Sequence, residues 1–166
     1  MSTQPEVWLR GPVKGVSPRL QPAAHAFLQT VEDVEGAVDG LTADQLWTTP
    51  GGAASVGFHL LHLAGATDRL LTYARGEPLS DLQRAQLQKE RNPPRADIAS
   101  LLADLRKAVD GALDQLRNTP DAALEEGRAI GRAALPTTVL GLLFHTAEHA
   151  QRHAGQVVTT AKILRA

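Results

Sequence analysis

The stretch TTVLGLLFHTAEHAQRHAGQVVTTAKIL, residues 137–164, decides how the rest of the chain is interpreted. It contains no proline and its apolar residues recur at helical spacing, so it predicts one long helix. His145, His149 and His153 follow one another at four-residue intervals within it, and Gln156 comes three residues later. Four residues make about one helical turn, or roughly 6 Å of rise, so the three imidazoles share one face. Two imidazoles at this spacing can bind the same metal ion.

The remaining apolar patterns predict three more long helices, separated by breaks that contain glycine and proline. Alanine and leucine are abundant and aromatic residues make up only 4% of the chain, which favours an all-α protein. We therefore expect an all-α four-helix bundle over residues 19–166, with an extended N-terminal arm over residues 1–18 and a long loop before the last helix. The expected long helices are Leu20 or Pro22 to Val38, Val56 to Arg75, Ala96 to Arg117, and Thr137 or Thr138 to the end, with a short turn at Leu46 and Trp47 and a short helix from Ser80 to Glu90.

The composition excludes several classes of protein. The net charge of −1 gives no basic surface for nucleic acid. The chain has no cysteine, so a metal site must use nitrogen and oxygen ligands, and disulfides and a catalytic cysteine are excluded. The first residues lack the apolar core of a secretory signal, and no apolar run is long enough to span a membrane. We expect a cytoplasmic protein.

Three histidines on one helix cannot all bind one ion. His145 and His153 are roughly 12 Å apart along the helix axis, too far for two ligands at about 2.1 Å from the same metal. One adjacent pair must therefore act with a ligand from another helix, and His25, His59 and His62 are the candidates. Such a three-ligand site keeps coordination positions open, as catalytic sites do.

Two segments resemble the DinB-like (DinB/YfiT) superfamily of four-helix-bundle metalloenzymes: SVGFHLLHLA, residues 55–64, and HAQRHAGQ, residues 149–156. The resemblance covers nearly the whole chain, and the second segment is its more specific part. It implies a metal site formed by His62, His149 and His153, with a divalent ion such as zinc, nickel or iron. Copper also suits three imidazoles.

The resemblance also implies an activity. Members of the superfamily include thiol-dependent S-transferases, in which the metal binds a low-molecular-weight thiol and lowers its pKa. We expect a metal-dependent enzyme that transfers such a thiol to a small electrophilic substrate, and the resemblance allows a homodimer. A hydrolase that uses a metal-bound water is the alternative within enzymes. A metal-binding, stress-associated bundle without turnover is the alternative outside them.

Further residues are candidates for the surroundings of the metal. His145 is expected to line the pocket or to orient a ligand, His59 can face either the pocket or solvent, and Gln156 can orient a ligand or serve packing. In the loop over residues 118–136, Arg128 and Arg132 are candidates for binding an anionic group beside the metal. The alternative is that both are exposed charges which balance nearby acidic residues.

Overall fold

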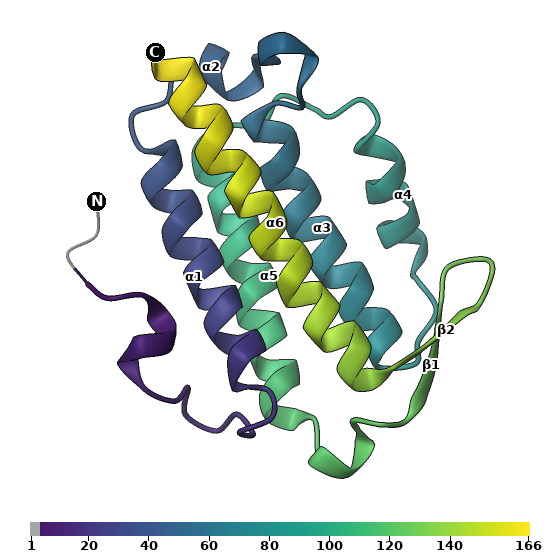
Figure 1. Cartoon of the computed structure of the whole chain (residues 1–166). Helices are drawn as coiled ribbons and strands as arrows, with labels where there is room; N and C mark the ends of the chain where they lie inside the picture. Colours follow the sequence, from purple (N-terminus) through teal and green to yellow (C-terminus); the bar gives the residue numbers. More distant parts are fainter. Residues whose placement is uncertain (1–3) are drawn as a thin grey trace.

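The computed structural model describes residues 4–166, so residues 1–3 of the expected arm lie outside the described part of the chain. Four long helices form the bundle that the sequence predicts (Figure 1). Helix α6 packs against α1 and α3, and α5 packs against the same two helices from the other side. The helices are α1 (Gln21–Val38), α2 (Ala43–Trp47), α3 (Val56–Ala74), α4 (Asp81–Lys89), α5 (Ile98–Asn118) and α6 (Val139–Arg165).

The directions of the long helices explain the position of α4 in the connection between α3 and α5. Helices α1 and α6 run in the same direction, and α3 and α5 both run in the opposite one (Figure 1). Two helices that follow each other in the chain and run in parallel need a connection that returns along their whole length. Helix α4 lies on that return path between α3 and α5.

The core follows the helical periodicity of the long segments. In α5 the buried apolar residues recur at three- and four-residue steps, as the sequence predicts. Phe27, Leu60, Leu105 and Leu143 come from four different helices and are completely buried. Each such side chain contributes about 1.5–3 kcal/mol by its removal from water. Polar N-caps start several helices, among them Ser55 before α3 and Ser80 before α4.

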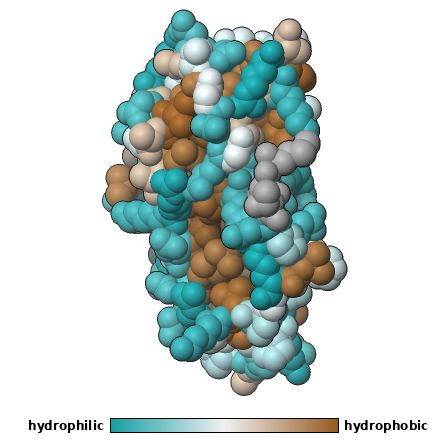
Figure 2. All heavy atoms as spheres, turned by 90° about the vertical axis from the view of Figure 1, so that its left-hand side faces the viewer, coloured by the Kyte–Doolittle hydropathy of each residue, from teal (hydrophilic) through white to brown (hydrophobic). Residues whose placement is uncertain are grey.

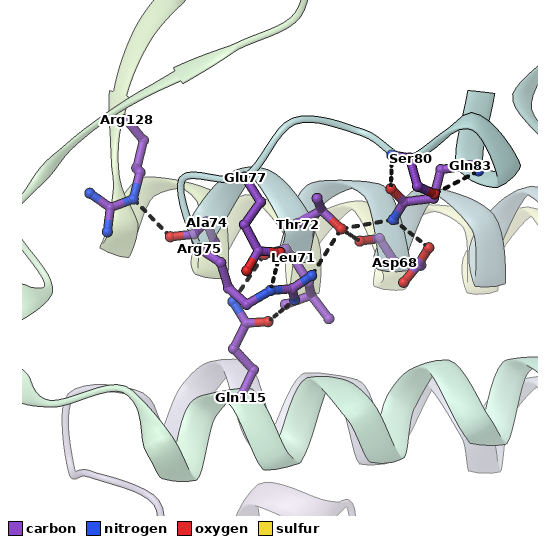
Figure 3. A network of polar contacts seen from close by, with 10 residues as sticks. All are labelled: Asp68, Leu71, Thr72, Ala74, Arg75, Glu77, Ser80, Gln83, Gln115 and Arg128. Atoms are coloured by element: carbon purple, nitrogen blue, oxygen red, sulfur yellow. Dashed lines mark hydrogen bonds and ion pairs between the residues drawn. The ribbon is translucent and has the colours of Figure 1, made fainter.

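Helix α4 is attached to the bundle by polar rather than apolar contacts. Gln83 is its buried residue, and the Gln83 side chain donates hydrogen bonds to Asp68 Oδ2 and Thr72 Oγ1 of α3 at 2.7 Å (Figure 3). The leucines of α4 point elsewhere, since Leu82 is 68% exposed and Leu87 is 39% exposed. At the end of α4, the C-cap Glu90 is buried again.

Within residues 4–18, the N-terminal arm contains a 3₁₀ helix at Val7–Arg10 and a turn at residues 14–15. Trp8 and Leu9 do not anchor the arm, because both are more than half exposed. The buried residues of the arm are Val7 and Val16. Polar side chains of α1, among them Gln21, also hydrogen-bond to the arm backbone.

The loop before the last helix is not wholly irregular. It contains a 3₁₀ turn at Asp121–Ala123 and an antiparallel hairpin of β1 (Gly127–Ile130) and β2 (Leu135–Thr138). Thr137 and Thr138 therefore belong to a strand, and α6 begins at Val139 with Thr138 as its N-cap. Strands of four residues that contain glycine or proline give too little alternation to be recognised from sequence.

On the face that carries α1 and the arm, polar side chains surround a band of apolar residues along the long axis (Figure 2). Within residues 4–166, none of the helices combines the length and the hydropathy needed to cross a membrane.

Gly57 is required by a close helix contact. A Cβ atom at this position would lie 2.8 Å from the indole of Trp47, whose Nε1 donates a hydrogen bond to the carbonyl of Ala96. Gly57→Ala should therefore lower the free energy of unfolding by about 1–3 kcal/mol through overpacking. Urea denaturation monitored by circular dichroism measures this change.

Gly111→Ala is the matched control. Gly111 also lies inside a long helix, but no atom would come within 4 Å of a Cβ there. Alanine favours the helix by roughly 0.5–1 kcal/mol, so this variant should be more stable than the parent protein. Equal effects of the two substitutions would contradict the packing argument.

Candidate metal centre

The antiparallel packing of α3 and α6 places His62 opposite His149 and His153. The Nε2 atoms of His62 and His149 are 3.5 Å apart, and the ring centroids of His62 and His153 are 4.6 Å apart. Each of the three side chains offers one nitrogen, and these nitrogens all lie within 4.8 Å of one another. The structure therefore brings together the three histidines that the sequence singled out.

These distances suit a shared cation. Two nitrogens bound to one metal at about 2.1 Å with a tetrahedral angle are separated by about 3.4 Å. The 3.5 Å between the Nε2 atoms of His62 and His149 is close to that value, and it is long for a hydrogen bond. Among the described residues this group contains nitrogen donors only. Such a donor set can hold a divalent transition metal rather than calcium or magnesium.

Glu90 fixes the orientation of His62, and the sequence analysis missed it. His62 Nδ1 lies 2.8 Å from Glu90 Oε2. Glu90 is the carboxylate partner of both Arg69 and His62, so Nδ1 of His62 donates to it. The lone pair of His62 is then on Nε2, which lies 3.5 Å from Nε2 of His149. Arg69 donates from Nη1 to the other carboxylate oxygen at 2.6 Å, and both partners are more than 90% buried. A carboxylate behind a metal-binding histidine is a common arrangement.

One glycine of the sequence, Gly65, indicates the close approach of Glu90 to α3. Gly65 lies inside α3, where glycine is unfavourable. A Cβ atom there would lie 2.8 Å from both Arg69 Nη1 and Glu90 Oε1. A glycine within a helix can thus mark the close approach of another segment, although it does not say which one.

His59 supports His153 in a similar way. It is buried, and its Nδ1 lies 2.9 Å from Nδ1 of His153. The sequence left open whether His59 faces the pocket or solvent. In the structure its side chain is buried beside His153. If His153 donates this hydrogen bond, its Nε2 keeps the lone pair that a metal requires.

Burial favours the neutral form of three imidazoles, those of His59, His149 and His153. It lowers the pKa of His149 to about 4. It also lowers the pKa of His153 to about 4 and lowers the pKa of His59. Burial alone would raise the pKa of Glu90, but the hydrogen bonds from His62 and Arg69 outweigh it and hold that pKa below its ordinary value. His149 and His153 therefore present neutral nitrogens, and Glu90 places a carboxylate behind His62, which suits metal binding.

Of the other residues predicted to surround the metal, His145 lies next to the cluster and Gln156 is not joined to it in the described part of the chain. The ring of His145 is 5.8 Å from that of His149 between centroids, and its Nδ1 lies 3.1 Å from Glu148 Oε2. A cavity of about 220 Å³ is lined by both of these histidines. Gln156 is exposed, and no hydrogen bond joins it to the histidines within residues 4–166.

The two arginines of the hairpin are not part of the cluster. Arg128 donates from Nε to the carbonyl of Ala74 at 2.9 Å (Figure 3). It also pairs with Glu126. Ala74 lies twelve residues beyond His62 on α3, roughly 18 Å along the axis. Arg132 is exposed in the turn of the hairpin. This placement argues against the anion site beside the metal that we predicted.

The fold and the cluster define a helical bundle with a three-histidine, nitrogen-only candidate metal centre. A family model of the DinB superfamily matches residues 26–157, and the chain belongs to that superfamily. No curated protein matches the chain.

Two solved structures share the fold. A conserved protein from Enterococcus faecalis is 18% identical, with a TM-score of 0.71, and the match covers 87% of this chain and 96% of that one. YfiT from Bacillus subtilis, a probable metal-dependent hydrolase with an unusual four-helix bundle topology, is 17% identical with a TM-score of 0.66, and the match covers 93% of each chain.

The buried histidines predict how the metal-free protein responds to pH. The pKa values of His149 and His153 are about 4 in the folded state, below the ordinary 6.5 that applies on unfolding. Between these values the unfolded chain binds more protons, so stability must fall as the pH is lowered. We expect a loss of about 2 kcal/mol for each of these two histidines between pH 7 and pH 5, measured by urea denaturation in the presence of a chelator.

The control is the double variant His149→Gln and His153→Gln, which cannot take up these protons. Its stability should change less over the same interval, because the unfolded carboxylates titrate mainly below pH 5. Parallel pH dependences of parent and variant would show that other groups are responsible.

Proposed function

We propose that the protein is a metal-dependent hydrolase whose ion is held by His62, His149 and His153. The observation that carries this proposal is the set of three converging nitrogens beside a cavity, with no fourth protein ligand in the described part of the chain. Three ligands leave coordination positions for water and substrate, which distinguishes catalytic from structural sites. The shared fold with YfiT, itself a probable metal-dependent hydrolase, supports the same class.

The side chains around the three histidines have distinct tasks. Glu90 and Arg69 hold His62 so that its Nε2 lone pair faces the site, and His59 does the same for His153. A divalent ion bound there, zinc, nickel or iron, supplies a Lewis acid and activates water.

His145 is our candidate for proton transfer. Glu148 accepts a hydrogen bond from Nδ1 of His145, so the Nε2 atom keeps its lone pair. The His145 ring also lines the cavity beside His149. We expect Nε2 to take a proton from the attacking water and return it to the leaving group.

Transfer of a thiol remains the competing reaction at the same centre. It would use the same open metal position, with a low-molecular-weight thiol as the nucleophile. Arg128 and Arg132, which we expected to bind the anionic groups of such a thiol, lie away from the histidine cluster. Thiol transfer therefore loses the support that was specific to it. Hydrolysis needs no further binding site and is therefore preferred.

Oxygen-18 labelling separates the two reactions. The zinc-loaded protein is incubated with a panel of small esters and amides in labelled water, with and without each of several low-molecular-weight thiols. Hydrolysis places one solvent oxygen in the acid product, whereas thiol transfer yields an unlabelled adduct that requires thiol. Mass spectrometry reads both products.

Two variants make the result specific. His149→Ala should abolish metal-dependent product, because it removes a ligand. His145→Ala should keep the metal and lower kcat by about 10²-fold or more. Equal product from parent and His149→Ala would show that surface groups catalyse the reaction, and an occupied site without any product would favour a non-catalytic metal-binding bundle.

A further inference from the structure

The structure has two cavities around α4 that differ in character. The larger, about 830 Å³, lies between α3, α4 and α5, and none of the three clustered histidines lines it. Its polar floor is occupied by internal contacts: Gln83 binds Asp68 and Thr72, and Arg75 binds Glu77 and Gln115 (Figure 3). These partners already satisfy one another, so this cavity offers no evident ligand chemistry.

The smaller cavity, about 220 Å³, begins at the histidine cluster. On α3 it is lined by Ala66, Arg69, Leu70 and Tyr73, which lie four, seven, eight and eleven residues after His62 and therefore on the same helical face. On α6 it is lined by His145 and His149. The cavity thus extends from the candidate metal ligands toward the end of α3.

Apolar side chains make most of its wall. Leu70 comes from α3, Leu79 precedes α4, and Leu87 belongs to α4. Leu87 is 39% exposed although it borders the cavity, so its side chain covers the opening rather than filling the core. An exposed leucine beside a candidate reaction centre offers apolar surface to a ligand.

The one arginine of the cavity is not available as an anion receptor. Arg69 is 9% exposed and donates to Glu90 Oε1, which fixes it as part of the support of His62. A carboxylate in the cavity would have to displace Glu90. The wall therefore favours an uncharged apolar group over an anionic one.

We infer that the small cavity binds a short, uncharged alkyl or aromatic group of the substrate, so that the substrates are neutral acyl compounds such as apolar esters or amides. This inference rests on the proposed function, because it names the part of the substrate that lies beside the reacting bond. If a methylene occupies about the volume of a water molecule, roughly 30 Å³, the cavity of about 220 Å³ takes a chain of about seven carbons.

Alkyl hydroxamates of two, four, six and eight carbons test this on the zinc-loaded protein, because their head group binds an open metal position. Titration calorimetry should show affinity rising about threefold per added methylene, roughly 80-fold from two to six carbons, and then levelling off. A six-carbon hydroxamate that ends in a carboxylate should bind no better than acetohydroxamate. Equal affinity along the series, or tighter binding of the carboxylate compound, would overturn the inference.

Substitutions on α4 provide a matched pair. Leu87→Trp fills the small cavity and should weaken the six-carbon compound at least tenfold while leaving acetohydroxamate unchanged. Leu82→Trp makes the same change on the same helix at the larger cavity and should alter neither. Leu79→Trp is a second filling variant if Leu87→Trp does not fold.

The outcomes also separate the two proposals. If zinc-loaded protein binds no hydroxamate at all, the open metal site of the proposed function fails, and the subsite fails with it. If all hydroxamates bind equally, only the subsite fails. A chain-length dependence that is the same in Leu87→Trp would place the apolar contact elsewhere and overturn the inference.

Discussion

Replacing His62, His149 or His153 with alanine is expected to reduce the affinity for zinc by about 10²–10³-fold. Zinc binding by four protein ligands provides about 10–16 kcal/mol, so each ligand carries roughly 3–4 kcal/mol. The three nitrogens that lie within 4.8 Å of one another should share this contribution nearly equally. Competition with a chromophoric chelator measures the affinity, and elemental analysis of the purified variants gives the stoichiometry.

His25→Ala is the control for a histidine outside the cluster. Its Nε2 lies 3.0 Å from the carbonyl of Gly11 in the arm, so its loss should leave the zinc affinity unchanged. His59→Ala should lower the zinc affinity by about 10–100-fold, because His59 orients a ligand. This loss is smaller than that of the three ligand variants and larger than that of His25→Ala. A metal-loaded structure in which His59 or His145 replaces one of the three ligands would refute the assignment.

Replacing Glu90 with alanine should have two separate effects. It leaves the guanidinium of Arg69 buried without its partner, which should lower the free energy of unfolding by about 3–5 kcal/mol. It also removes the acceptor of His62 Nδ1, which should lower zinc affinity by about 10–100-fold. Urea denaturation in chelator measures the first effect and chelator competition the second.

The double variant Glu90→Leu and Arg69→Met separates these effects. Apolar residues of similar volume can replace a buried ion pair at little cost, so stability should return toward that of the parent. The zinc affinity should stay low, because His62 still lacks its acceptor. Recovery of both properties would show that Glu90 acts through stability alone and does not orient His62.

The bundle and the cluster were predictable because their signals are local. In α5, apolar residues at three- and four-residue steps decide both the helix and its buried face. The spacing of His149 and His153 follows from one helix, and the resemblance to the superfamily supplied His62. Each of these predictions needs only residues within one element, or one motif.

The remaining features depend on where separate elements meet. The pairing of His62 with Glu90 joins α3 to the end of α4, and it exists because α4 returns along α3. Arg128 was placed beside the metal because its loop leads into α6, but the hairpin directs it to the end of α3 instead. Proximity along the chain to a helix that carries ligands therefore does not predict proximity to the ligands.

The position of α6 has a consequence for how the protein matures in the cell. The candidate ligands of α3 and α6 are separated by 87 positions in the chain, and α6 is the last helix of the described bundle to be synthesised. During translation His62 leaves the ribosome long before His149 and His153, because synthesis proceeds from the N-terminus and a domain generally folds as a unit. Metal can therefore be loaded only after α6 has docked between α1 and α3. A nascent chain without α6 would present one of the three candidate ligands, His62, and it should not retain the ion.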